Sequence, residues 1–456
     1  MTKPPSKLRA AKLELYRQQG KIHAREVAGR FNCLRWAMVG LTQIIFYGTC
    51  WLTWESNGVS RQAVLFDIAH ERLYLLGLVL WPQDALLLAL VLILAATGLF
   101  LVTALAGRLF CGFACPQTVY TMIFAWIEAR VEGDPLARLK LDNSPPGPGK
   151  LARKALKHGL WVLLAAWTAI TFVGYFTPIR QLLPSMATLQ TGPWEAFWLI
   201  FYGVFTYVQA GLAREAVCQH MCPYSRFQGV MFDPATINVA YDRRRGEPRR
   251  AGGNCIDCGI CVEVCPVGID IRDGLQYPCI NCGLCIDACD PVMDSVGAPR
   301  GLIRFASANE LSDRRAAAGF LRPRLAVYGV VLVAGVLLVA GYLGERSPLR
   351  VDVLRDRGAL ARETAEGRFE NAYTLQLMNL DDVPRQFRVT VSGLPGLEIA
   401  GADRFAVDAA SIRPLAVTVT TTGEALPSGI RPIRFTIVAE DDPAIRVEEP
   451  SSFAQP

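Results

Sequence analysis

Charged side chains are scarce in this sequence. They account for 19% of the 456 residues, whereas hydrophobic residues account for 52%. The apolar residues gather in several long runs, and about 20 predominantly apolar residues are enough for a helix to cross a bilayer. The composition therefore excludes a wholly soluble protein and predicts an integral membrane protein.

Histidine is also rare, with four residues in the chain. His23, His70 and His158 lack the spacing that marks a haem site, although a haem ligated by His158 remains a weaker alternative. A short charged leader is missing as well, because about thirty polar and basic residues precede the first apolar run. We therefore expect no cleavable secretory signal and a first span that stays in the mature protein.

Cysteine, in contrast, is abundant: there are fourteen, and eight of them lie between Cys255 and Cys289. The runs CIDCGICVEVC and CINCGLCIDAC both have the spacing C-x2-C-x2-C-x3-C, with which bacterial ferredoxins bind a 4Fe-4S cube. In two-cluster ferredoxins the fourth cysteine of each run binds the cube of the other run. We accordingly assign one cluster to Cys255, Cys258, Cys261 and Cys289, and the second cluster to Cys279, Cys282, Cys285 and Cys265. Gly259 and Gly283 stand where the chain must wrap closely around inorganic sulfide.

Two other uses of these cysteines are weaker. A disulfide framework needs an oxidising compartment, and a tetrahedral zinc site would leave thiols over in such a run. Four acids near the runs either lower the cluster potentials or solvate an exposed loop, and the sequence favours neither role: Asp257, Glu263, Asp287 and Asp290.

Five membrane spans are expected, at about residues 36–54, 84–106, 160–176, 194–212 and 325–343. The apolar segment 118–131 is too short to cross comfortably and predicts an interfacial or re-entrant helix. Basic residues crowd the N-terminus, which the positive-inside rule places in the cytoplasm. The chain then divides into a basic segment (1–35), two membrane repeats (36–230), a cytoplasmic two-cluster ferredoxin domain of α+β type (231–310), a last transmembrane helix (325–343) and a C-terminal domain (350–456).

The C-terminal domain has a different pattern. Stretches such as QFRVTVSG and IRFTIVAE alternate apolar and polar residues and are separated by Pro and Gly, which predicts an immunoglobulin-like β-sandwich. Five spans from a cytoplasmic N-terminus place this domain in the periplasm. Residues 243–250 are strongly basic, and we interpret them as a positive-inside loop rather than a nucleic-acid site.

A second set of thiols lies at the ends of the two membrane repeats. Each repeat ends in an arginine followed by C-x3-C-P, with Cys111 and Cys115 in the first copy and Cys218 and Cys222 in the second. On a helix this spacing would put both sulfurs of a pair on one face. Repeats in membrane proteins often enclose a shared site, so the two pairs are candidates to converge on copper or iron-sulfur, which thiolates select.

Two interpretations of these thiols without a bound metal stay open. The four cysteines could pack as buried apolar residues or form a disulfide relay, although a reducing compartment disfavours stable disulfides. His220 and Met221 add further donors inside the second pair. Cys33 and Cys50 have no partner in the sequence and are interpreted as packing residues.

The chain resembles a family of bacterial cytochrome c oxidase accessory proteins, the membrane polyferredoxins called FixG, RdxA or CcoG. The resemblance covers nearly the whole sequence, and five features carry it in addition to the β-rich tail: WPQD at residues 81–84, GRLFCGFACPQTV from Gly107, CPYSRFQGVMFD from Cys222, YDRRRGEPRR from Tyr241 and the double cysteine run. It implies two 4Fe-4S clusters and an electron-transfer role in maturing a cbb-type oxidase.

The resemblance further implies that the protein reduces Cu(II) to Cu(I) and that Cys111, Cys115, Cys218 and Cys222 handle the copper. A cytoplasmic electron donor and cbb-type oxidase subunits or copper chaperones are the implied partners, in the bacterial inner membrane. Two other functions compete with this one. The first is electron transfer between quinone and a reductase, as in NapH-type proteins, and the second is a non-catalytic scaffold for oxidase assembly.

Overall fold

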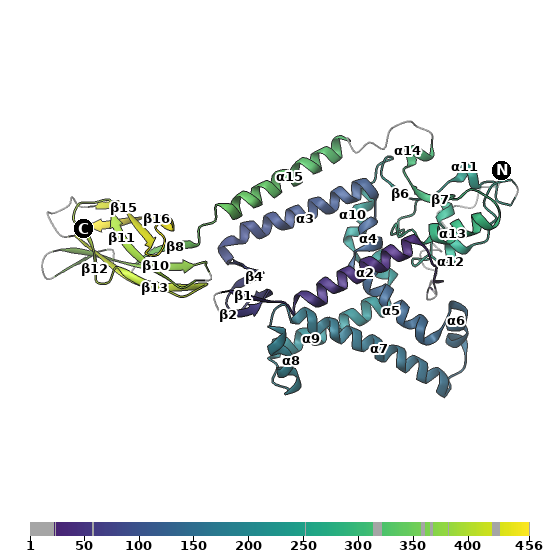
Figure 1. Cartoon of the computed structure of the whole chain (residues 1–456), viewed down its shortest axis with the longest axis horizontal. Coiled ribbons are helices and arrows are strands. Elements are labelled where there is room, and N and C mark those ends of the chain that lie inside the picture. Colours follow the sequence, from purple (N-terminus) through teal and green to yellow (C-terminus); the bar gives the residue numbers. More distant parts are fainter. Residues whose placement is uncertain are drawn as a thin grey trace, which may run out of the picture. The chain divides into compact units, whose positions relative to one another are not determined.

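The computed structural model describes residues 22, 24–56, 59–250, 252–312, 322–356, 361–364, 368–381, 383–421 and 429–455. Most of the basic segment predicted at residues 1–35, with His23, lies outside these residues. The chain forms two compact units, one of Met1–Trp51 with Leu88–Val336 and one of Leu52–Leu87 with Leu337–Pro456. The first unit contains the cysteines, and the second contains the β-rich C-terminal region (Figure 1).

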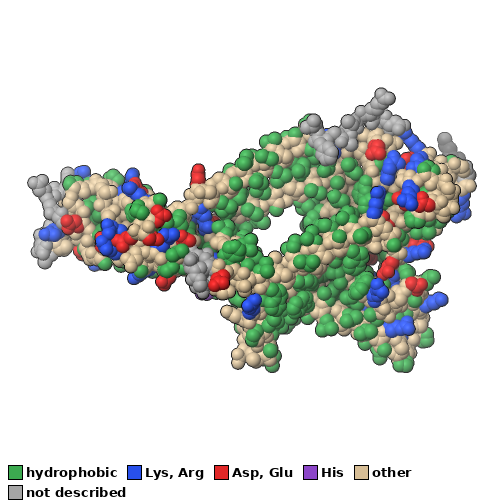
Figure 2. All heavy atoms as spheres, in the orientation of Figure 1, with side chains coloured by type: hydrophobic (Ala, Val, Ile, Leu, Met, Phe, Trp, Pro, Cys, Tyr) green, Lys and Arg blue, Asp and Glu red, His purple; other side chains and the backbone are tan. Residues whose placement is uncertain are grey.

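Five helical stretches of the described chain are long and apolar enough to cross a membrane. They are η1 (Pro82–Asp84) with α3 (Ala85–Ala106), α4 (Leu109–Phe113) with α5 (Pro116–Glu132), α7 (Pro148–Val173), α9 (Pro193–Thr206) with η2 (Tyr207–Ala213), and α15 (Pro323–Gly344). Hydrophobic side chains lie along the length of α3 and α15 on the face seen in Figure 2. The prediction of a helical membrane protein is confirmed.

The set of candidate spans differs from the predicted set at two places. The expected first span, 36–54, lies mostly in α2 (Arg30–Thr49), which is less apolar than the five candidates because it carries Arg30, Arg35 and several polar residues. The segment 118–131 belongs to the longer α5, which together with α4 qualifies as a span. Its shortness, the reason for expecting an interfacial helix, therefore does not hold.

Helix α7 begins at Pro148, well before the residue expected to start the third span. Its basic first turns pair with Glu132 at the end of α5, through Lys154 at 3.0 Å and Lys157 at 2.9 Å. Glu132 is buried, so these cations offset a charge that would be costly alone. Two short helices complete the region, α6 (Pro135–Asn143) and α8 (Ile179–Ala187).

The double cysteine run lies on a small α+β module that follows α10 (Pro223–Met231). Its strands β6 (Asn238–Tyr241) and β7 (Ile303–Ala306) pair antiparallel. Between them lie α11 (Arg243–Gly246), α12 (Ile260–Glu263), η4 (Ile271–Asp273) and α13 (Leu284–Ser295), and α14 (Ala308–Leu311) follows. Gly259 and Gly283 both have positive φ, 74° and 76°, which a side chain would strain.

The C-terminal region is a β-sandwich, as the alternating pattern predicts. One sheet has the order β12 (Leu397–Ala400), β14 (Ser411–Thr421), β10 (Phe369–Asn379), β8 (Leu349–Arg355), with β9 (Arg362–Glu363) paired to β10. The other has the order β13 (Arg404–Val407), β11 (Arg385–Ser392), β15 (Gly429–Ala439), β16 (Arg446–Gln455). Tyr373, Leu375, Phe387 and Phe435 lie at most 2% exposed between the sheets.

The loop between α2 and α3 has structure that the sequence analysis missed. It holds β1 (Thr53–Ser56) paired with β2 (Val59–Gln62), and a sheet of β3 (Val64–Asp67), β4 (Arg72–Leu75) and β5 (Leu78–Leu80). Trp81 packs in one cluster with Ala410 of the sandwich. Buried Asp84 accepts hydrogen bonds from Arg346 at 2.8 Å and from Tyr342 at 3.0 Å. The WPQD motif thus ties this loop to the start of the C-terminal domain.

Candidate electron-transfer site

Four cysteines of the module line one cavity: Cys255, Cys258, Cys261 and Cys289. They come from the first run and from the end of the second run, the combination assigned to one cluster. Arg272 also lines this cavity, and its guanidinium is held by Asp257 at 2.6 Å and Asp270 at 2.7 Å. Cys258 is exposed to solvent, so this cavity lies close to the module surface.

A second cavity is lined by the other four assigned cysteines, Cys265, Cys279, Cys282 and Cys285, with Cys261 at its edge. Its apolar surroundings include Val264, Ile280 and Leu284, and Cys111 of the membrane region packs against the same cluster of residues. The second cavity therefore faces the helices instead of solvent.

Both cavities fit an iron-sulfur cube better than a single ion. No three Cys, His, Asp or Glu side chains in the described chain lie close enough to hold one metal ion. A cube of four irons keeps its thiolates further apart than one ion does. Burial raises the pKa of Cys279 and of Cys289 to about 12 and that of Cys261 to about 11. These thiols would stay protonated at neutral pH without metal, and iron would displace their protons.

The four acids near the cysteine runs all have specific partners. Asp257 pairs with Arg272, Glu263 with Arg25 at 3.4 Å, and Asp290 accepts from the Gly301 amide at 3.0 Å. Asp287 is buried and accepts from the amides of Phe31 at 3.2 Å and Asn32 at 2.7 Å, which lie in the first turn of α2. Loop solvation is therefore the wrong role for Asp287, which caps a helix of the membrane region.

The C-x3-C-P pairs do not lie on one continuous helix, as the spacing predicted. Cys111 belongs to α4 and Cys115 precedes α5, while Cys218 belongs to the π-helix η3 (Val217–Met221) and Cys222 precedes α10. Pro116 and Pro223 occupy the first position of the following helices, which suits proline and keeps the preceding cysteine extended. Each pair thus straddles a helix break, in the same way in both copies.

The two pairs come close enough to interact. Cys111 is within electrostatic range of Cys115 and Cys218, and Cys115 is within range of Cys222. Burial raises the pKa of Cys218 to about 11. The two copies therefore place their thiols near one another, but these four thiols do not form a preorganised site for one ion. Among the unpaired cysteines, Cys50 is buried as expected, whereas Cys33 is exposed and not a packing residue.

One short segment links the membrane thiols to the second cavity. A Cβ added to Gly112 would lie 2.6 Å from the Ile280 carbonyl oxygen and 3.0 Å from the Cys282 Cα, so α4 touches the loop between Cys279 and Cys282 directly. Asn281 of this loop donates to the Ala106 carbonyl at the end of α3, at 3.3 Å. Cys111 itself donates to Gln228 of α10 at 3.3 Å.

Arg108 lies near both groups of thiols. It is 3% exposed, donates to the Ser225 carbonyl and lies 4.7 Å from the centroid of the Tyr277 ring. Cys279, Cys111 and Cys218 all lie within range of its charge. A buried guanidinium here favours negative charge on either group. Its place one turn before C-x3-C-P was visible in the repeat, but its contact with the cluster loop was not.

The comparisons agree with this arrangement. Family models described as a 4Fe-4S dicluster domain, a 4Fe-4S binding domain and the Ig-like fold at the C-terminus of FixG match residues 213–308, 88–132 and 339–456. The nitrogen fixation protein FixG of Rhizobium meliloti is 36% identical over 96% of this chain and 91% of its own length. Protein RdxA of Cereibacter sphaeroides is 38% identical over 84% of each. The ferredoxin-type protein NapH of Haemophilus influenzae is 24% identical over 41% of this chain and 58% of its own length.

The fold and the two cysteine-lined cavities define a membrane-bound iron-sulfur protein of the electron-transfer class, with an immunoglobulin-like domain at its C-terminus. Identity above 30% over most of both chains makes the assignment specific. The chain belongs to the FixG and RdxA family.

Proposed function

We propose that this protein carries electrons from a cytoplasmic donor to the membrane thiols, where Cu(II) is reduced to Cu(I) for assembly of a cbb-type cytochrome c oxidase. The observation that supports this most is the contact of Gly112 with Ile280 and Cys282, which puts Cys111 against the second cluster loop. When bound, the two cubes supply one-electron transfer.

The chain's own residues give this route a direction. Cys258 and the Asp257 side of the module are accessible to a soluble donor, whereas the residues around the second cavity pack against Cys111 of the membrane region. Arg108 favours the more negative state of the groups around it. The soft thiols of Cys111, Cys115, Cys218 and Cys222 favour Cu(I) over Cu(II), so a copper ion that reaches them is easier to reduce.

The proposal also includes the orientation of the protein in the membrane and its protein partners. The basic N-terminus and the two-cluster module lie in the cytoplasm of a bacterium, and the β-sandwich lies in the periplasm, as the charge pattern predicts. The sandwich would then contact oxidase subunits or copper chaperones. Cysteine labelling with a membrane-impermeant reagent in intact cells tests this orientation: a cysteine placed in β15 should react, and a cysteine placed in α6 should not.

The function is tested with purified protein that is reduced anaerobically and mixed with Cu(II). We expect Cu(I) to form, and we expect Cys218→Ser to abolish its formation while the iron content stays at about eight per chain, the number that two cubes hold. A loss of iron in Cys218→Ser would mean that the membrane thiols bind iron, since both pairs lie within the matched 4Fe-4S models. Full copper reduction by Cys218→Ser would contradict the proposal.

A second candidate is electron exchange with a quinone, which the similarity to NapH favours. Reoxidation of the reduced protein by a quinone, with no response to Cu(II), would select it. An assembly scaffold would instead keep its clusters in one redox state throughout turnover.

A further inference from the structure

A cavity of about 570 Å³ in the cysteine-containing unit lies between the N-terminal segment, α5 and the two-cluster module. Cys218 lines it, and so do Val264, Ile280 and Leu284 from the surroundings of the second cluster loop. The cavity therefore touches both ends of the proposed last electron step. It has the volume of a small-molecule site and far exceeds what one metal ion occupies.

The lining is strongly cationic. Five arginines and two glutamates contribute a formal excess of three positive charges, from Arg25, Arg35, Arg130, Arg138 and Arg214 against Glu26 and Glu215. Two of the arginines already neutralise Glu128, at 3.8 Å and 2.6 Å, and Arg25 pairs with Glu263. Within the described chain, Arg35 and Arg130 have no carboxylate partner.

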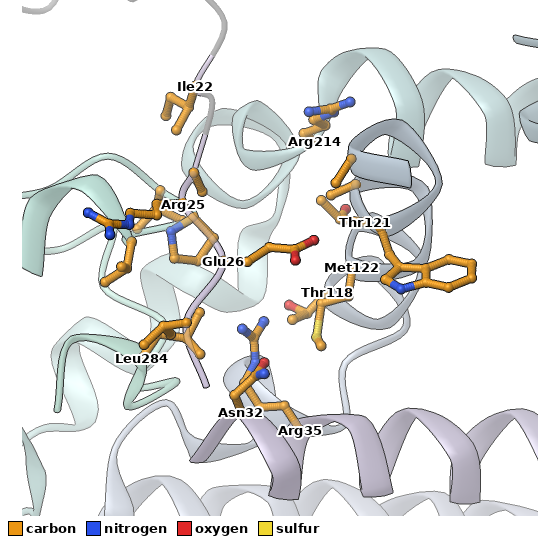
Figure 3. A pocket seen from close by; sticks show the side chains of 18 of the residues that line it. Ile22, Arg25, Glu26, Asn32, Arg35, Thr118, Thr121, Met122, Arg214 and Leu284 are labelled. Atoms are coloured by element: carbon orange, nitrogen blue, oxygen red, sulfur yellow. The ribbon is translucent and has the colours of Figure 1, made fainter. Parts of the chain in front are cut away.

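Arg35 is the residue that points to a ligand. It is 3% exposed, and its Nε donates to the Gly112 carbonyl at 3.1 Å, which fixes the side chain against α4. Figure 3 shows its guanidinium and the Glu26 carboxylate reaching into the cavity. Burying a guanidinium without a carboxylate partner costs free energy unless an anion binds to it. The paired N–H groups of a guanidinium match the geometry of a carboxylate.

Much of the remaining wall is apolar and aromatic and includes Trp36, Met122 and Trp126, and polar side chains such as Asn32 and Gln117 also line the cavity. A free Cu(II) ion would be repelled by the arginines and would meet no preorganised set of ligands here. A chelate with net negative charge and an organic body satisfies both parts of the lining.

We propose that this cavity binds Cu(II) as a small anionic chelate, with carboxylate groups on Arg35, and so presents the metal beside Cys218. The inference rests on the proposed function and names the form of its substrate. Glu26 lies at the same cavity with the opposite charge, so it opposes the chelate.

Binding can be measured without any redox step by equilibrium dialysis of untagged, oxidised full-length protein. The probes are Ni(II)-nitrilotriacetate, which is anionic, and Ni(II)-diethylenetriamine, which is cationic. We expect the anionic chelate to bind at one per chain and at least ten times more tightly than the cationic one. Equal binding of the two probes would overturn the proposal.

Two variants move the affinity in opposite directions. Arg35→Gln should weaken binding of the anionic chelate about tenfold, and Glu26→Gln should strengthen it several-fold. Arg180→Gln, an exposed arginine of α8 outside the cavity, should leave it unchanged. Glu26 is exposed, so its variant remains informative if Arg35→Gln folds poorly. An unchanged or weakened affinity in Glu26→Gln would contradict the proposal.

Copper reduction separates this inference from the proposed function. If reduced protein converts the nitrilotriacetate and diethylenetriamine complexes of Cu(II) at equal rates, copper reduction stands and the anion site is wrong. If the anionic probe binds as expected but no Cu(I) forms, the site stands as an anion site and its assignment to copper falls with the proposed function.

Discussion

The two cysteine runs have almost the same sequence, CIDCGIC and CINCGLC, yet they occupy opposite environments. In the first run, Asp257 pairs with Arg272 and Arg250, and the neighbouring Cys258 is exposed. In the second run, Asn281 is fully buried and hydrogen-bonds Asn238 and Ala106, and Cys282 is buried against α4. The same position of the two runs thus holds the acid Asp257 at the solvent side of the module and the amide Asn281 at its membrane side.

This difference gives the module a direction. Two similar cubes could pass electrons either way, but the first run has an exposed cysteine for a soluble donor, and the loop of the second run touches the helix that carries Cys111. Asp257 and Asn281 both have positive φ, 57° and 55°, a conformation that Asp and Asn tolerate better than most residues. The loops therefore share a backbone and differ in what their side chains meet.

The largest expected effect is that of Asn281→Asp. A carboxylate there would face the Asn238 and Ala106 oxygens, to which the amide now donates, and would be a buried, unpaired charge. We expect a cost of about 3 kcal/mol or more, measured as earlier bleaching of half of the iron-sulfur absorbance in a denaturant titration. Tolerance of the acid would mean that this loop is solvated like the first one.

Gly112→Ala should have the next largest effect. Its Cβ would collide with backbone atoms of the second loop, and overpacking of this kind costs about 1–3 kcal/mol. We expect Cu(I) formation to slow at least tenfold, with the first cluster retained. Gly40→Ala on α2 is the matched control, because a Cβ there meets nothing within 4 Å. Equal rates for both variants would place the electron route elsewhere.

Asp287→Ala removes the cap of α2 and should cost about 1 kcal/mol, the usual value for a helix cap. The cost should appear in the unfolding of the membrane region as well as in cluster loss, because Asp287 joins the two through Phe31 and Asn32. Asp290→Ala, which loses one contact within the module, provides the comparison. Identical effects of the two variants would show that Asp287 acts within the module only.

The smallest effect is expected for Asp257→Asn. The carboxylate is about a third exposed, and pairs of this kind contribute no more than about 1 kcal/mol. Denaturant titration of the cluster absorbance should therefore barely change, while Asn281→Asp changes it strongly. If both variants were equally damaging, the contrast between the runs would have no energetic basis.

The sequence was sufficient where a short pattern dictates local geometry. The cysteine spacing and Gly259 and Gly283 predicted tight cluster loops, and alternation predicted the sandwich. It was insufficient where distant residues meet. Nothing near Asp287 in the sequence indicates that it caps α2, and nothing near Gly112 indicates that a loop 170 residues away excludes its side chain. Arg35 shows the same limit, since nothing near it in the sequence indicates that a carbonyl of α4 accepts its hydrogen bond.

The central claim is that charge leaves the module at its membrane side and reaches copper. Rapid freeze-quench paramagnetic resonance of fully reduced protein mixed with one equivalent of Cu(II) tests it most directly. The account predicts that the Cu(II) signal and the magnetic interaction between the two reduced cubes disappear at the same rate. A Cu(II) signal that persists, or that decays while both cubes stay reduced, would contradict it.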